Sequence, residues 1–162
     1  MPFTAVRGPN KMPLTNFTFG VRGAAPVSVT SAAVSLSPDT YAFRPVVLNL
    51  AAGIATTLPA ATGSGDTYSL FIGTTFTGSA TIKVASASDI MTGYAELLQD
   101  AADTVVAFET AADSDTITFN GTTTGGLKGT QVVLIDIAAN LWAVSLVGAA
   151  TGVEATPFSA TV

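Results

Sequence analysis

The chain contains no cysteine and no histidine among its 162 residues. Without cysteine it forms neither a disulfide framework nor a thiolate metal site, and it gives no indication of its redox compartment. Without histidine it lacks the commonest general base and the commonest transition-metal ligand. Catalysis would therefore have to rely on carboxylates, lysine, tyrosine or an unassisted serine.

Charged residues are also scarce. They make up 10% of the chain, compared with roughly 25% in a typical soluble domain, while hydrophobic residues make up 48%. The polar share comes mainly from threonine and serine. A surface with so few charges is poorly suited to a free monomer at high concentration. The composition therefore favours a subunit whose faces are largely covered by neighbours.

The few charges are unevenly distributed. Residues 1–44 contain four basic residues and one acidic residue, whereas the remainder contains two basic and ten acidic residues. A net-acidic body argues against nucleic-acid binding, which needs basic faces. No apolar run approaches the ~20 residues of a membrane span, and the first residues lack the apolar segment of a secretory signal. We therefore expect a protein made in the cytoplasm that binds neither nucleic acid nor membrane.

The first 26 residues read as a separate segment. They hold four prolines and three glycines, which disfavour regular structure, yet they also carry aromatic residues that solvated linkers usually lack. This combination predicts an extended docking arm; the alternative is a loose tail that packs on its own domain. The side chains expected to contact a partner are Phe3, Arg7, Lys11, Leu14, Phe17, Phe19 and Arg22.

Residues 27–162 have the pattern of a single β-rich domain. Short segments rich in Val, Ile, Thr and aromatic residues alternate apolar with polar positions and are bounded by Gly, Pro, Asn, Asp or Ser. Such a pattern predicts an all-β fold, here an antiparallel β-sandwich of the jelly-roll type with the N-terminal arm extended. The segment "IDIAANLWAV" predicts a hairpin, and "GYAELLQDAADT" predicts one or two helical turns or a loop. Residues from about 150 to 162 are expected to form an extended strap, because Pro157 cannot occupy a central strand.

Two motifs suggest ligand binding at first sight. "GSGDTYSLFIG" resembles a phosphate-binding loop, but it lacks the full P-loop order and no helix follows it. Gly63 and Gly65 are better interpreted as turn residues. "DSDT" places Asp113 and Asp115 two residues apart, as in calcium loops, but the rest of that pattern is missing. We expect an exposed turn there.

Two further residues stand out in the last third of the chain. Asp136 lies within the apolar run "VVLIDIA", so its carboxylate needs either solvent or hydrogen-bond partners. If it points inward, a structural role is expected rather than a catalytic one. Trp142 is expected in the core or at a subunit interface. No residue is assigned to catalysis, to a cofactor or to a metal.

At residues 54–158 the sequence resembles small β-rich virion proteins of tailed bacteriophages, in particular the head decoration (cement) proteins. The resemblance rests on "TLPAATGSGDTYSLFIGTTFTGSATIKVA", "DIMTG", "TFNGTTTGGLKGTQVVLIDIAANLWAV" and "TGVEATPF". Within these runs the shared features are Leu58-Pro59, the turn at Gly63 and Gly65, the turn Gly125-Gly126-x-x-Gly129, and the hairpin from Asp136 to Trp142. None is a catalytic signature.

The resemblance implies a virion protein that binds the outer surface of an assembled phage capsid. Its partners would be the major capsid protein and further copies of itself, as a homotrimer, and it would clamp neighbouring capsomers. One alternative is a tail-fibre or receptor-binding module that recognises host-surface glycans, which predicts an exposed aromatic and acidic groove. A less favoured alternative is a glycosidase, which requires two carboxylates about 5–9.5 Å apart across a cleft.

Overall fold

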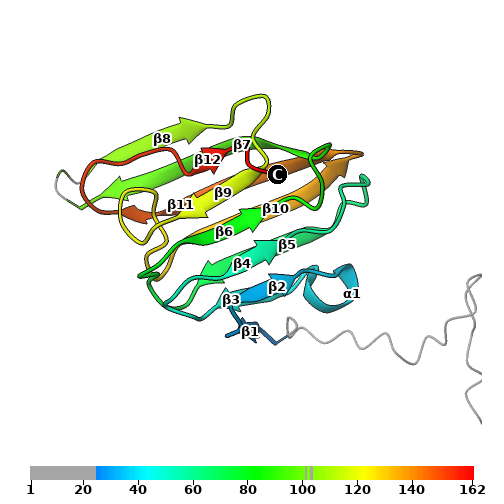
Figure 1. Ribbon diagram of the computed structural model, residues 1–162, viewed down its shortest axis with the longest axis horizontal. Helices are drawn as coiled ribbons and strands as arrows, with labels where there is room; N and C mark the ends of the chain where they lie inside the picture. The colour runs from blue at the N-terminus through cyan, green and yellow to red at the C-terminus, as the bar shows by residue number, and fades with distance from the viewer. Residues whose placement is uncertain (1–24, 101, 103) are drawn as a thin grey trace, which may run out of the picture.

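The computed structural model describes residues 25–100, 102 and 104–162, and its regular structure is almost entirely β (Figure 1). The larger sheet has seven strands, in the spatial order β1 (Val27–Val29), β3 (Pro45–Leu48), β5 (Thr67–Ile72), β10 (Gln131–Ala138), β11 (Leu141–Ala150), β7 (Ile90–Gln99) and β8 (Val105–Glu109). The smaller sheet has five, in the order β12 (Phe158–Ser159), β9 (Thr116–Phe119), β6 (Ala80–Lys83), β4 (Ala55–Thr57) and β2 (Ala33–Ser35). The all-β prediction is confirmed.

Helix contributes little to this fold. The helix α1 (Pro38–Tyr41) is four residues long and begins at a proline, which suits the first turn because its missing N–H would have no partner there. Within the described part of the chain, no helix has the length and apolar character needed to cross a membrane.

The expectation of antiparallel sheets was wrong for half of the strand pairs. From β1 to β6, successive strands alternate between the two sheets. Each strand therefore runs in the same direction as the previous strand of its own sheet. As a result β1, β3 and β5 are parallel to one another, and so are β2, β4 and β6. β11 and β7 are also parallel, and the five remaining pairs are antiparallel. The sheets are thus mixed rather than antiparallel, and the jelly-roll arrangement is not confirmed.

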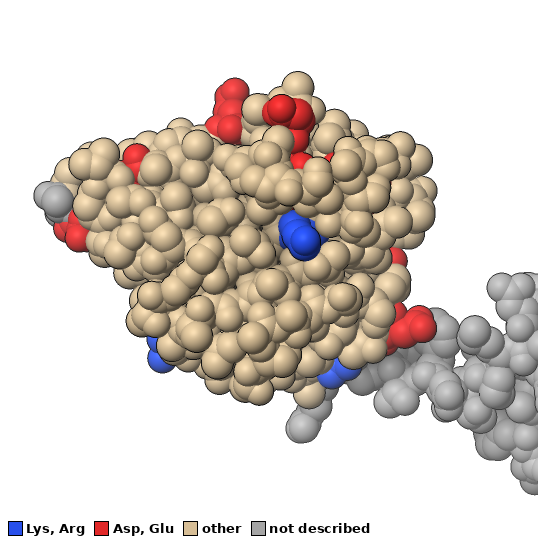
Figure 2. Space-filling model, viewed as in Figure 1, with Lys and Arg blue, Asp and Glu red and all other residues tan. Residues whose placement is uncertain are grey.

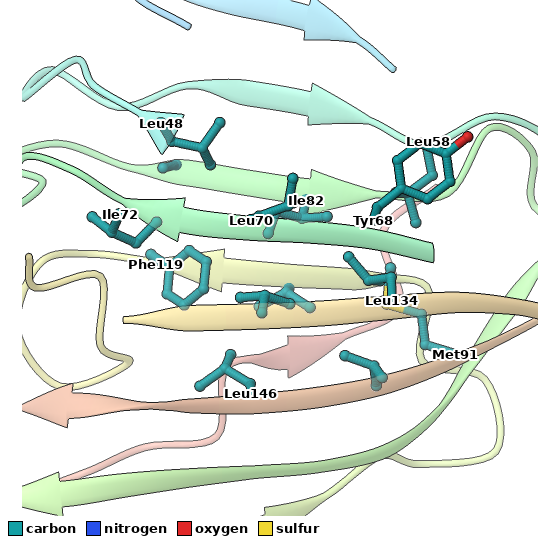
Figure 3. Close-up of a cluster of buried hydrophobic side chains, with 14 of the residues drawn as sticks. Leu48, Leu58, Tyr68, Leu70, Ile72, Ile82, Met91, Phe119, Leu134 and Leu146 are labelled. Atoms are coloured by element: carbon teal, nitrogen blue, oxygen red, sulfur yellow. The ribbon is translucent and has the colours of Figure 1, made fainter. Parts of the chain in front are cut away.

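The hydrophobic core lies between the two sheets (Figure 3). In β5 the side chains of Tyr68, Leu70 and Ile72 are fully buried and alternate with partly exposed ones, the period-2 pattern of a strand with one covered face. Trp142 is fully buried and meets Tyr68 edge to face, with ring centroids 5.7 Å apart. Trp142 is therefore a core residue. Burial, together with the charges of Asp66 and Asp136, raises the pKa of the Tyr68 hydroxyl to about 12.

The hairpin prediction is confirmed. β10 and β11 pair in antiparallel register, and Ala138 lies opposite Leu141, which leaves two residues to make the turn. The second of these, Asn140, has φ of 62°, a left-handed conformation that asparagine tolerates better than most residues.

The segment "GYAELLQDAADT" is neither a helix nor a loop over its first half. β7 continues to Gln99, with Ala95 and Leu97 buried and Glu96 and Leu98 exposed. This strand pairs with β11 on one side and β8 on the other. The ladder bonds on both sides outweigh the modest helix propensity of glutamate, leucine and glutamine.

Glycine is required where β7 passes β11. Gly93 has φ of 149°, and a Cβ atom added to it would lie 1.8 Å from the carbonyl oxygen of Val144. Gly65 also has a positive φ, of 79°, but a Cβ atom there would meet nothing within 4 Å. A comparison of alanine substitutions at these two positions therefore separates the cost of steric overlap from the cost of backbone strain.

We predict that Gly93→Ala lowers the free energy of unfolding by more than about 3 kcal/mol, because backbone must move to relieve the overlap. Gly65→Ala is the matched control and should cost about 1–2 kcal/mol, the strain of a left-handed alanine. Urea unfolding followed by the fluorescence of the single, buried Trp142 measures both. If the two variants lost equal free energy of unfolding, the steric overlap at Gly93 would be contradicted.

Candidate interaction surface

The seven side chains predicted to dock on a partner lie outside the described residues. Phe3, Arg7, Lys11, Leu14, Phe17, Phe19 and Arg22 all belong to residues 1–24. The described chain begins at Ala25, whose carbonyl oxygen accepts a hydrogen bond of 2.9 Å from Nη2 of Arg44. Arg44 lies between α1 and β3, so the segment joins the body at the β1 end of the seven-stranded sheet.

The side of the seven-stranded sheet that faces away from the core, here called the outer face, is broad and almost uncharged. It consists of the outward positions of β3, β5, β10, β11, β7 and β8. Register places apolar outward residues side by side: Val47 beside Phe71, and Leu98 between Ala149 and Val105. Among these outward positions only Glu96 and Glu109 are charged, both on the last two strands.

The opposite surface, on the five-stranded sheet, has a different chemistry. Its outward row runs through Ala33, Ala55, Thr81 and Thr118, and the next row contains Lys83. Figure 2 shows one side of the molecule, whose central area is nearly free of charged side chains apart from one basic patch; further basic side chains lie at its lower margin. Acidic side chains appear mainly at its margins. Large apolar side chains therefore gather outward on the seven-stranded sheet, whereas the outward row of the five-stranded sheet consists of alanine and threonine.

The outer face carries a shallow hollow of about 550 Å³ over β7 and β8. Its lining includes Tyr94, Glu96 and Glu109, and Tyr94 is 48% exposed. Tyr94 lies directly opposite Glu109, while Glu96 lies opposite Ala107. Glu96 and Glu109 are therefore diagonal neighbours, and such positions are about 7–8 Å apart. The alternation of Tyr94, Glu96 and Leu98 with buried residues was the available sequence signal for this surface, and the helix-or-loop interpretation missed it.

Asp136 points inward and is surrounded by donors, as expected of a buried carboxylate. It accepts hydrogen bonds of 2.7–3.1 Å from the backbone N–H groups of Thr62, Gly63 and Ser64. The hydroxyl groups of Thr62 and Ser64 also donate to it. Burial alone would raise the pKa of Asp136, but these bonds outweigh burial and lower the pKa from 3.8 to about 2. Its role is structural.

The loop before β5 is held by a second buried carboxylate as well. The N–H of Ala61 donates to Oδ2 of Asp89 at 3.2 Å, so four successive N–H groups, from residue 61 to residue 64, bind carboxylates. Concave runs of backbone N–H groups are general anion-binding sites. The phosphate-loop appearance of "GSGD" therefore has a physical basis, but the anion bound there is the side chain of Asp136.

Asp115 corrects the expectation of an exposed turn at "DSDT". Asp113 is exposed, but Asp115 is only 6% exposed and accepts hydrogen bonds from the N–H groups of Thr161 and Val162 and from the hydroxyl of Thr116. Burial opposes ionisation, yet these bonds and the charge of Lys83 lower the pKa of Asp115. The carboxylate fixes the last residues of the chain against β9.

Among the described residues, no group of three or more acidic side chains is placed to hold a metal ion. The chain matches no protein-family model, no curated protein and no solved structure. The resemblance to phage decoration proteins thus has no independent support from these comparisons. The candidate functional site is the outer face.

We predict that Asp136→Asn lowers the free energy of unfolding at pH 7 by about 2–4 kcal/mol, because the amide cannot accept from all five donors and loses the charge. The folded-state pKa lies below the ordinary value. The wild-type contribution is therefore complete above about pH 4 and is lost as the pH falls towards 2.

Urea unfolding at several pH values measures this difference. The gap between wild type and Asp136→Asn should shrink by roughly 2 kcal/mol between pH 5 and pH 2. Asp113→Asn, at an exposed position, is the control and should stay within about 0.5 kcal/mol of wild type. A gap that does not change with pH would show that the charge of Asp136 does not stabilise the loop.

Proposed function

We propose that this protein is a virion structural protein that binds the outer surface of a phage capsid and stabilises it by holding neighbouring capsomers together. The observation that carries this proposal is the outer face: a wide, nearly uncharged sheet surface with exposed Leu98, Val105, Ile137 and Val147. Exposed apolar area of this kind marks an interaction surface. The resemblance of residues 54–158 to decoration proteins supports the same function.

The proposed mechanism is thermodynamic linkage. A ligand that binds only the assembled shell stabilises it by RT ln(1 + [L]/Kd) for each site, and a capsid offers many equivalent sites. The two-sheet core and the buried carboxylates give a rigid body. The basic residues Arg7 and Lys11 of the N-terminal segment add a second point of attachment. Attachment at two points raises avidity through effective concentration.

We predict that the double variant Arg7→Glu/Lys11→Glu binds capsids lacking the protein at least about tenfold more weakly than wild type, because reversing two charges turns attraction into repulsion. The number of copies per purified particle, from gel densitometry, measures binding. Lys83→Glu/Lys128→Glu is the control, since both lysines lie on the described body. Equal binding by wild type and the arm variant would contradict docking by the arm.

A glycan-binding module is the second candidate, because the hollow on β7 and β8 combines the exposed Tyr94 with Glu96 and Glu109. An aromatic ring beside carboxylates suits the apolar face and the hydroxyl groups of a sugar. Both glutamates are exposed, whereas a glycosidase needs its pair across an enclosing cleft. The hollow therefore favours binding over hydrolysis.

For this candidate we expect Tyr94→Ala to abolish binding on a glycan array of bacterial surface saccharides. Capsid binding by the same variant should remain unchanged if the hollow serves glycans only. Phe43→Ala, at a residue 69% exposed outside the hollow, is the aromatic control. A wild-type protein that binds no saccharide would eliminate the candidate.

A further inference from the structure

The two ends of the molecule carry opposite charge. Between Asp89 and Asp115 the chain holds seven acidic residues, and it holds no basic residue from Val84 to Leu127. This part forms β7, β8 and the loop into β9. The N-terminal segment, with its three basic residues, joins the other end beside β1 and Arg44. In the seven-stranded sheet β1 and β8 are the two end strands.

The acidic end contains a groove of about 240 Å³ between the two sheets. Phe108 of β8 and Phe158 of β12 line it, and the exposed Glu109 and Asp113 lie at its border. A cavity of about 150 Å³ is enough to hold a benzene ring, so the groove has room for an aromatic side chain. Asp115 holds residues 161 and 162, which directly follow the lining residues Ser159 and Ala160.

The strands beside this groove have an unpaired edge within the described residues. β8 pairs only with β7, and β12 pairs only with β9. An end strand presents backbone N–H and C=O groups that a further extended segment can bind. The groove thus combines an aromatic pocket, an acidic border and an open strand edge.

The chain contains a segment with the complementary properties. In "TNFTFGVR", residues 15–22, the apolar Phe17, Phe19 and Val21 alternate with Asn16, Thr18 and Gly20, and Arg22 follows. Alternation of this kind is typical of a strand with one apolar face. Its aromatic residues suit the pocket, and its charge suits Glu109 and Asp113.

We propose that residues 15–22 of one copy bind in the β8–β12 groove of a second copy, as a strand added to β8. Phe17 or Phe19 fills the space between Phe108 and Phe158, and Arg22 lies near the acidic border. When two copies lie end to end, the segment of one and the groove of the next are brought together directly. To reach its own groove, the segment would have to cross six strand spacings, about 29 Å.

Each copy has one such segment and one such groove at opposite ends, so the contact is head-to-tail. Repeated contacts of this kind close into a ring or continue as a chain, according to the rotation between copies. The association needs no capsid and therefore goes beyond the proposed function. It assigns Phe17, Phe19 and Arg22 to a neighbouring copy and leaves Phe3, Arg7, Lys11 and Leu14 for the shell.

The absence of native cysteine makes a cross-linking test direct. Full-length Val21→Cys, at a position on the same strand face as Phe17 and Phe19, is mixed with full-length, tagged Ala111→Cys, whose substituted residue is exposed and lines the groove. We expect a disulfide-linked heterodimer on non-reducing gels. Tagged Ala33→Cys is the control, because Ala33 is also exposed but lies on β2 at the other end. Heterodimer yields that are equal for the two partners, or absent for both, would overturn the proposal.

The double variant Val21→Cys/Ala111→Cys distinguishes a second copy from the same molecule. Linked multimers support the proposal, and a monomer closed by an internal disulfide overturns it. Light scattering of cysteine-free protein without capsids gives an independent measure. Wild type should show masses that are multiples of 16.3 kDa. The dissociation constant for self-association of Phe17→Ser/Phe19→Ser should be at least about tenfold higher than that of wild type. Phe3→Ser is the control and should behave as wild type, whereas equal dissociation of both variants contradicts the proposal.

Discussion

The fold depends on a constraint set by the path of the chain. From β1 to β6 the chain crosses from one sheet to the other after every strand, so its loops turn at the rims of the core, where backbone N–H groups lose water. An unpaired buried N–H is costly. At the crossing from β4 to β5, Asp136 and Asp89 supply the acceptors, and near the end of the chain Asp115 supplies them for residues 161 and 162. Each of the three carboxylates is 6% exposed or less. Buried carboxylates thus fix one crossing and the last residues of the chain.

This use of charge affects the surface as well. The outward positions of β3, β5, β10 and β11 carry no charge, while exposed acids such as Glu96, Glu109 and Asp113 lie towards the β8 end. The molecule is therefore nearly uncharged across its broad side and acidic at one end, with a basic segment attached at the other. These are the properties on which the proposed contacts with other proteins, at its face and at its ends, depend.

Local features of the sequence predicted the strands well, because alternation and turn residues act over a few positions. The Asn140 turn and the buried face of Tyr68, Leu70 and Ile72 follow from such patterns. The direction of pairing does not, because a strand such as β3 has the same alternation whether its neighbour is parallel or antiparallel. β7 was missed because Glu96 to Gln99 favours helix and becomes a strand only between β8 and β11. The partners of Asp136 were equally hidden, since they lie 72 to 74 residues away.

The parallel pairing of β7 with β11 has a consequence for synthesis on the ribosome. β7 ends at Gln99, but its partner is complete only at Ala150. At about 5–20 residues per second, the newly made β7–β8 hairpin waits several seconds for its neighbour. During that interval Ala95 and Leu97 have no covering strand beside them, and the open edge is a template for misassembly. The seven acidic residues between Asp89 and Asp115 carry like charge, which opposes pairing between two such edges.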